Sequence, residues 1–221
     1  MGKRAIVLGA TGVVGRALVE ILSQSPAIES VTAISRRKVV YQRANIINQV
    51  IDFDRLNASA EVFNGDVLFS CLGTTAKLAG SKAKQRLVDV DYQYQAAQLA
   101  FQRGVNHYLL VSSSGANAAS RHDYLQMKGE LEQKVAAIGF KRVSIFQPSL
   151  IIGQRHDVRV GEIIGSRLMP WLCQLPMLAK YRPITGEQVA LSLTATGLST
   201  AAPTQRLTYY RLDELHQLAK A

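Results

Sequence analysis

Cysteine is scarce in this chain of 221 residues, in which Cys71 and Cys173 are the only two. They lie far apart and neither belongs to a second CxxC-type pair, so neither a disulfide framework nor a cysteine-based zinc site is expected. The four histidines also lack metal-ligand spacing. The sequence therefore predicts no metal site and is typical of a protein in a reducing compartment.

Long apolar runs are also missing, since no stretch has the length and character of a membrane span. The most apolar tract, residues 163–181, is interrupted by Arg167, Pro170 and Pro176, and we predict a helix-rich lid there. The opening MGKRAIVLGATG places basic residues before an apolar run, as a secretion signal would. That run is short, breaks at Gly9 and lacks a cleavage site. We expect no transmembrane segment and a cytoplasmic location.

Acidic residues are outnumbered, with 16 Asp and Glu against 26 Lys and Arg, and the formal net charge is +10. This balance favours an anionic partner, which could be nucleic acid, an anionic surface or a small ligand. The basic residues are spread in short groups, without a helix-turn-helix pattern, zinc-finger spacing or an aromatic run. Dedicated nucleic-acid binding is therefore not expected.

A strand, a glycine turn and a helix open the chain. Residues 4–8 form a short run that is continuously apolar from Ala5 onward, typical of a strand buried on both faces of a parallel sheet. The following GATGVVG places glycines at Gly9, Gly12 and Gly15. Gly9 permits the tight turn, Gly12 lets backbone amides approach a pyrophosphate, and Gly15 allows the helix to pack closely. With the positive end of the helix facing the anion, this pattern predicts a dinucleotide site.

Strands and helices then alternate along the chain. Helical stretches near 55–63, 86–103 and 124–138 separate strand-like runs at 30–34, 47–51, 66–72, 107–112 and 142–147. Regular alternation predicts parallel strands with right-handed crossovers, which is an α/β fold with a doubly wound parallel sheet, a Rossmann fold.

We expect residues 1–150 to form the NAD(P)-binding domain and residues 151–221 to form a small C-terminal cap on its substrate side, in one structural unit. The cap is predicted to contain a helix near 187–197, a strand near 205–210 and a closing helix. Met169, Trp171 and Met177 in the lid tract are more typical of core than of a substrate pocket. Arg155 and Arg182 suit either an acidic substrate or an exposed structural role.

The end of the second strand predicts which dinucleotide is bound. Sites for NAD usually carry a carboxylate about 20 residues past the glycines. This chain instead has Ser35, Arg36 and Arg37 there, and guanidinium groups suit the 2′-phosphate of NADP(H). A solvated basic turn is the alternative. The cofactor is further expected to meet Asp52 and Phe53 at its adenine, and the residues after the fourth strand at its middle, among them Cys71, Leu72, Gly73 and Thr74.

Tyr124 and Lys128 lie four residues apart on a predicted helix, so both face the same strip of its surface. A phenol with a pKa near 10 exchanges protons poorly at neutral pH, whereas a nearby ammonium stabilises the phenolate. Tyr124 could then give a proton to a carbonyl oxygen as hydride leaves a nicotinamide, with Lys128 on the ribose and Ser113 on the substrate oxygen. The alternative is an ordinary surface pair.

The segments GATGVVG, ISRRK, NQVIDFD, SCLGTT, VSSSGA and YLQMKGELEQKV together resemble an atypical short-chain dehydrogenase/reductase. More narrowly, they resemble the Tat-interacting-protein-like oxidoreductases and their bacterial relatives labelled nucleoside-diphosphate-sugar epimerase-like, over about residues 3–155. The resemblance implies an NADPH-binding Rossmann fold with a Ser–Tyr–Lys set. It carries cofactor or catalytic roles onto Gly9, Thr11, Gly12, Val13, Val14, Ser35, Arg36, Asp52, Leu72, Gly73, Tyr124, Lys128, Pro148 and Leu150.

Two departures from that pattern matter. The interval from Ser113 to Tyr124 is shorter than in most such reductases, which leaves open whether Ser112, Ser113 or Ser114 faces the substrate. The region after the sixth strand is too short for a large nucleotide-sugar. Two functions remain open: an NADP(H)-dependent oxidoreductase acting on a small carbonyl or alcohol, or an NADPH-sensing regulatory protein that binds a protein partner. The chain is expected to be a monomer or homodimer.

Overall fold

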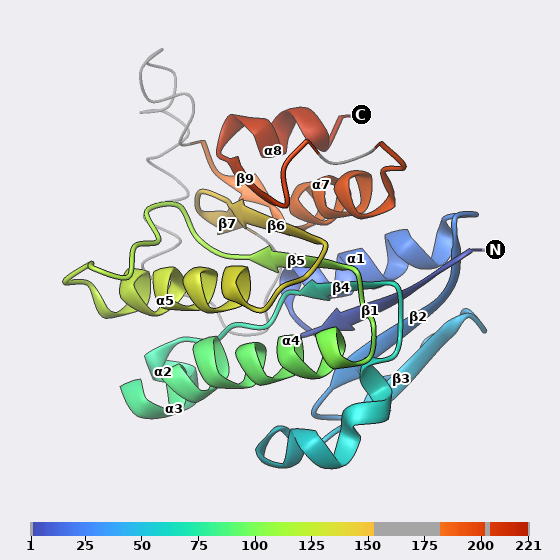
Figure 1. Cartoon of the computed structure of the whole chain (residues 1–221), viewed down its shortest axis with the longest axis horizontal. Helices are drawn as coiled ribbons and strands as arrows, with labels where there is room; N and C mark the ends of the chain where they lie inside the picture. The colour runs from blue at the N-terminus through green and yellow to red at the C-terminus, as the bar shows by residue number, and fades with distance from the viewer. Residues whose placement is uncertain (1, 153–181, 202–203, 221) are drawn as a thin grey trace.

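The computed structural model of the chain describes residues 2–152, 182–201 and 204–220. Within them, seven strands form one parallel sheet in the order β3-β2-β1-β4-β5-β6-β9 (Figure 1). The predicted doubly wound α/β sheet is therefore confirmed. The strands are β1 (Lys3–Leu8), β2 (Ile28–Ser35), β3 (Ile46–Val50), β4 (Val67–Ser70), β5 (His107–Val111), β6 (Arg142–Gln147) and β9 (Leu207–Arg211).

Helices cover both faces of this sheet (Figure 1). On one face lie α1 (Val13–Gln24) and α7 (Gly186–Leu198), with α8 (Asp213–Leu218) packed beside α7. On the other lie α4 (Tyr92–Gln102) and α5 (Asp123–Ala137). The shorter elements are the 3₁₀ segment η1 (Phe53–Phe63), α2 (Ala76–Ala79), α3 (Lys82–Arg86), the π-helical turn η2 (Leu87–Asp91), and the paired strands β7 (Ile151–Ile152) and β8 (Ile184–Thr185).

The strands are buried on both sides, as their apolar runs predict. Along β1, Ala5 and Val7 belong to the core formed with α1 and α7, whereas Ile6 and Leu8 belong to the core formed with α4 and α5. All four side chains are at most 1% exposed. Because successive side chains point to opposite faces, one continuous apolar strand serves two cores.

Two predicted helices differ from the structure. The stretch near 55–63 is a kinked 3₁₀ segment, with non-helical backbone angles at Arg55 and Ser59. The predicted helix over 86–103 is present as a continuous helical run through α3, η2 and α4, but it contains the π-helical turn η2. This turn includes the fully buried Asp89, whose carboxylate accepts hydrogen bonds from the Thr74 amide and from Gln85. Such tertiary contacts are invisible to helical periodicity.

The C-terminal elements confirm the predicted helix, strand and closing helix. α7 packs so closely on α1 that a Cβ at Gly186 would lie 2.4 Å from Val13 Cγ1, and β9 pairs with β6 in the main sheet. These elements thus complete the sheet and its helical layer. The domain division at residue 150 and a cap over the substrate side stay predictions. The lid tract 163–181, with Met169, Trp171 and Met177, and Arg155 lie outside the described residues.

Across residues 2–152, 182–201 and 204–220, each helix is too short or too polar to cross a bilayer. The same residues contain no group of three or more His, Cys, Asp or Glu side chains placed to hold a metal ion.

His107 gives stability a dependence on pH. Burial lowers the pKa of His107 from 6.5 to about 3, and the charges of Arg142 and Lys3 act in the same direction. Between these pH values the unfolded chain binds a proton that the native state does not, so stability falls as the pH is lowered. From pH 7 to pH 5 we expect this group alone to remove about 2 kcal/mol.

Urea unfolding of the wild type and His107→Gln at both pH values measures this effect. Glutamine keeps a polar group facing Ser144 Oγ, which lies 2.9 Å from His107 Nε2, but it does not titrate. The variant should lose about 2 kcal/mol less than the wild type over that pH interval. Equal losses in both proteins would contradict the assignment.

Candidate functional site

A cleft of about 1510 Å³ lies where the strands β1 to β6 end. Its walls come from the loops that follow these strands and from the first turns of α1 and α5. Of the predicted site residues, Gly15 is absent from the lining. The others line the cleft: Gly9, Thr11, Gly12, Val13, Val14, Ser35, Arg36, Arg37, Asp52, Phe53, Cys71, Leu72, Gly73, Thr74, Ser113, Tyr124, Lys128, Pro148 and Leu150.

The three glycines of the first turn differ in what constrains them. Gly9 has a φ of +81°, and a Cβ there would lie 2.7 Å from the Leu72 amide. A Cβ at Gly15 would lie 2.2 Å from the Gly9 carbonyl oxygen. Gly15 therefore lets the helix pack closely on the turn without lining the cleft. At Gly12 the nearest atom would be 3.4 Å away. The protein itself therefore tolerates a side chain at Gly12, and the open space there suits a ligand.

Helix α1 directs its positive end at this cleft. Gly12 is its N-cap, and among the described residues no side chain caps it and no acidic group lies in its first turn. The first amide groups of a helix lack partners within it and attract anions. Arg16, one turn further on, also lines the cleft. This end of the site is suited to a phosphate group.

The loop after β2 is held by a residue that sequence reasoning missed. Ser35 Oγ donates to the Arg37 carbonyl oxygen (2.7 Å) and accepts from Asn48 Nδ2 (2.9 Å). Asn48 also accepts from the Val39 amide at 2.7 Å. The Ser35 hydroxyl is thus engaged in shaping the loop that presents Arg36, and its predicted contact with a ribose stays a prediction. Asn48 carries no sequence signal beyond its place on a strand.

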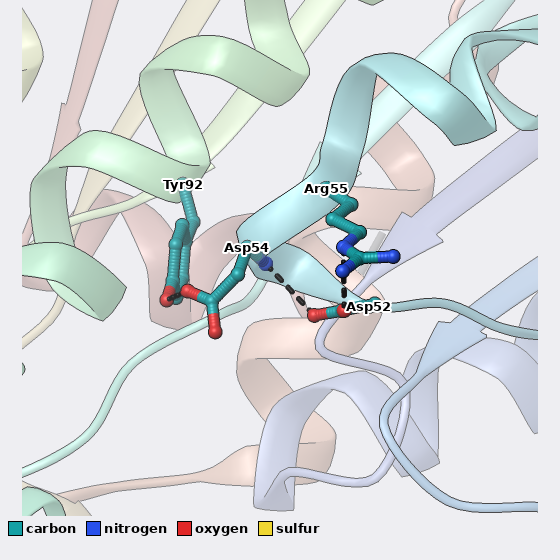
Figure 2. Close-up of polar contacts among 4 residues, drawn as sticks. All are labelled: Asp52, Asp54, Arg55 and Tyr92. Carbon is teal, nitrogen blue, oxygen red and sulfur yellow. Dashed lines mark hydrogen bonds and ion pairs between the residues drawn. The ribbon is translucent and has the colours of Figure 1, made fainter.

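Beside the cleft, α4 meets η1 through polar contacts (Figure 2). Asp52 Oδ1 accepts from the Asp54 amide at 3.0 Å, and Arg55 Nε lies 4.0 Å from Asp52 Oδ2. The Tyr92 hydroxyl donates to Asp54, and this hydrogen bond, with burial, raises the pKa of Tyr92 to about 12. The rings of Tyr92 and Phe53, 5.6 Å apart, give the cleft an aromatic wall. Tyr92 was not predicted from the sequence.

Lys128 and Tyr124 both face the cleft from α5. Lys128 is 3% exposed, and its Nζ lies 5.9 Å from the centroid of the Tyr124 ring. Within the described parts of the chain, this ammonium has no hydrogen-bond acceptor and no ion-pair partner. The ammonium is not among the fully buried atoms that lack a partner, so it opens on the cleft, where a polar ligand can reach it.

The residues around this ammonium differ in polarity. A Cβ at Gly73 would lie 3.9 Å from Lys128 Nζ and 3.5 Å from Asp89 Oδ1, so Gly73 separates the cation from a buried carboxylate. Asp89 lines the cleft and was not predicted from the sequence. Burial raises the pKa of Cys71 to about 12, so this residue is a neutral thiol and a small apolar part of the wall.

Two of the three serines after β5, Ser112 and Ser113, are distinguished by their hydrogen bonds. Ser112 is 4% exposed, and its hydroxyl donates to the buried carboxylate of Glu132. Ser113 is half-buried, and its hydroxyl makes one long contact, 3.4 Å, with the Ser114 carbonyl oxygen. The Ser112 proton is therefore committed inside the protein, whereas the Ser113 hydroxyl can turn toward a ligand.

Comparison with known proteins finds one family model and several relatives. A model of the NAD-binding domain of semialdehyde dehydrogenase matches residues 4–92. Protein HTATIP2 of Rattus norvegicus is 42% identical over 170 residues, which are 75% of this chain and 69% of that protein. Protein FMP52, mitochondrial, of Candida glabrata is 34% identical over 215 residues, 91% of this chain and 90% of the relative.

Solved structures with the same fold are far less similar in sequence. UDP-glucose 4-epimerase of Thermotoga maritima, solved with UDP-glucose, superposes with a TM-score of 0.66 at 13% identity, covering 98% of this chain and 81% of that one. A short-chain dehydrogenase/reductase superfamily protein of Agrobacterium tumefaciens with bound NAD gives 0.70 at 13% identity, covering 95% and 77%. The chain belongs to the family of HTATIP2 and FMP52.

Proposed function

We propose that this chain is an NADP(H)-dependent oxidoreductase that transfers hydride to or from a small carbonyl or alcohol compound. The observation that carries the proposal is the ammonium of Lys128, which opens on the cleft, lacks a protein partner in the described residues and lies beside Tyr124, in a cleft that starts at a glycine turn. Ribose hydroxyls of a dinucleotide would give this ammonium the hydrogen bonds that it lacks.

In this mechanism the chain positions two ligands and moves one proton. A bound nicotinamide supplies the hydride. The amides at the start of α1 hold the pyrophosphate, and Lys128 holds the ribose. The Tyr124 hydroxyl gives its proton to the carbonyl oxygen, and the Lys128 charge stabilises the phenolate that remains. Ser113 donates a hydrogen bond that orients the same oxygen.

The proposed activity is tested by mixing the chain with NADPH and a panel of aldehydes and ketones and following nicotinamide absorbance. Consumption that depends on the carbonyl supports the proposal. If no carbonyl is reduced, and a protein partner binds only the NADPH-loaded chain, the function is that of a regulatory binding protein instead.

Preference for NADP(H) is proposed to come from Arg36, supported by Arg37. Both side chains are exposed at the cleft. The hydrogen bonds of Ser35 with the Arg37 carbonyl oxygen and with Asn48 fix the loop that carries them. Loss of a charge-assisted hydrogen bond to phosphate should weaken binding about 10- to 100-fold. Arg36→Ala should therefore weaken NADPH binding by that factor while NADH binding changes by less than about twofold.

Calorimetric titration with both cofactors measures this difference. Arg55→Ala is the matched control, because Arg55 is an exposed neighbour that contacts Asp52 but does not line the cleft. Equal losses for NADPH and NADH in Arg36→Ala would remove the assignment.

A further inference from the structure

Behind the serines lies a buried polar network that the proposed mechanism does not use. Glu132 is 5% exposed and lies one helical turn beyond Lys128 on α5. Its carboxylate accepts from the Ser112 hydroxyl and from Gln147 Nε2, at 3.0 and 3.1 Å for its two oxygens. Gln147 Oε1 in turn accepts from Arg211 Nε at 3.0 Å. One carboxylate thus connects α5 with the ends of β5, β6 and β9.

Each hydrogen bond of Glu132 is one that it accepts. Burial leaves the pKa of Glu132 above its ordinary value, although the hydrogen bonds from Gln147 and Ser112 and the charges of Lys128 and Arg211 partly offset this rise. A carboxylate is the form that matches two neighbouring donors, because a protonated acid would present its own proton to them. A buried carboxylate with a complete set of donors rigidifies what it contacts.

The segment that Glu132 holds is the one that presents Ser113. The Ser112 amide donates to the Phe146 carbonyl oxygen (2.8 Å), and the Ser114 amide donates to the Pro148 carbonyl oxygen (2.9 Å). With its neighbours fixed on both sides, Ser113 has its backbone held while its hydroxyl retains a single weak contact.

We propose that Glu132 is a positioning residue: by holding the Ser112 hydroxyl and the ends of β5 and β6, it leaves the Ser113 hydroxyl directed at the substrate oxygen. The role in turnover rests on the proposed oxidoreductase function, whereas the role in holding residues 112–114 does not.

Glu132→Gln changes the network without changing its volume. The new amide can still accept from Ser112, but it brings its own N–H groups against Gln147 Nε2, so one donor loses its partner. We expect amide hydrogen exchange of residues 112–114 to become about tenfold faster. We also expect kcat to fall about tenfold or more, with KM and the Kd for NADPH within about twofold.

The exchanged pair Glu132→Gln/Gln147→Glu restores the network and reverses only the hydrogen bond between positions 132 and 147. The amide at 132 then donates to the carboxylate at 147, which also accepts from Arg211, while Ser112 keeps its acceptor. The double variant should recover slow exchange at residues 112–114 and most of kcat. Glu130→Gln is the matched control on the same helix: Glu130 pairs with Arg86 at 2.7 Å, away from the serines, and should leave both measurements unchanged.

Unchanged exchange at residues 112–114 in Glu132→Gln overturns the proposal, and so does a double variant as impaired as the single one. If the wild type reduces no carbonyl, the proposed function fails, and the exchange measurements alone decide whether Glu132 holds this segment. Should Glu132→Gln fail to fold, Ser112→Ala removes the same hydrogen bond from the other side and must reproduce the faster exchange.

Discussion

Tyr124→Phe is expected to lower kcat for carbonyl reduction at least about 100-fold and to leave the Kd for NADPH within about twofold. The substitution removes one oxygen atom and keeps the ring that packs near Lys128. The proposed proton donor is therefore lost, whereas the ammonium proposed to hold the ribose and the glycine turn proposed to hold the pyrophosphate remain. Single-turnover kinetics with a saturating carbonyl, together with fluorescence titration of NADPH, separate the two quantities.

A second Tyr–Lys pair in this protein provides the control. Lys134 Nζ lies 5.0 Å from the Tyr94 ring, between α5 and α4, and neither residue lines the cleft. Tyr94→Phe removes the same atom from a similar aromatic–ammonium pair and should leave kcat unchanged. If both variants lose activity to the same extent, the effect comes from altered packing. If neither does, Tyr124 is not the proton donor.

The elements of the cleft could be predicted because their signals are local. The run from Ala5 to Leu8 followed by Gly9 marks a buried strand that ends in a turn, and the spacing of Tyr124 and Lys128 follows from helix geometry alone. Parallel strands that alternate with helices then bring these loops to one edge of the sheet.

The supporting residues could not be predicted, because their partners are distant in sequence. Asn48 lies on a neighbouring strand and holds the loop that carries Arg36. The carboxylate of Asp89 accepts a hydrogen bond from the Thr74 amide. The sequence around Glu132 indicates an ordinary helix residue, whereas in the structure Glu132 is buried and accepts hydrogen bonds from Ser112 and Gln147. A polar residue on a helix gives no sign of which strand end it contacts. Gly129 likewise gives no sign in the sequence of the loop that it contacts.

Gly129 allows α5 to lie against the loop that precedes it. A Cβ at this position would be 2.1 Å from the Ala118 amide nitrogen and 2.3 Å from the Asn117 carbonyl carbon. Both atoms are backbone, so no side-chain rotation can relieve the contact, and either the loop or the helix must shift. Since Gly129 directly follows Lys128 on α5, a shift of the helix also moves the proposed catalytic pair.

Gly129→Ala is therefore expected to destabilise the chain by about 2–3 kcal/mol, because overpacking costs ~3 kcal/mol or more whereas the better helix propensity of alanine returns only ~1 kcal/mol. For a chain of this size the loss corresponds to a Tm lower by roughly 5–10 °C. Gly73→Ala is the control for stability, since its Cβ would meet no atom nearer than 3.5 Å and should leave Tm almost unchanged. Calorimetric scans of the three proteins decide the matter. A Gly129→Ala chain as stable as the wild type would show that α5 does not pack on residues 117–118, and the placement of Tyr124 and Lys128 over the cleft would lose its support.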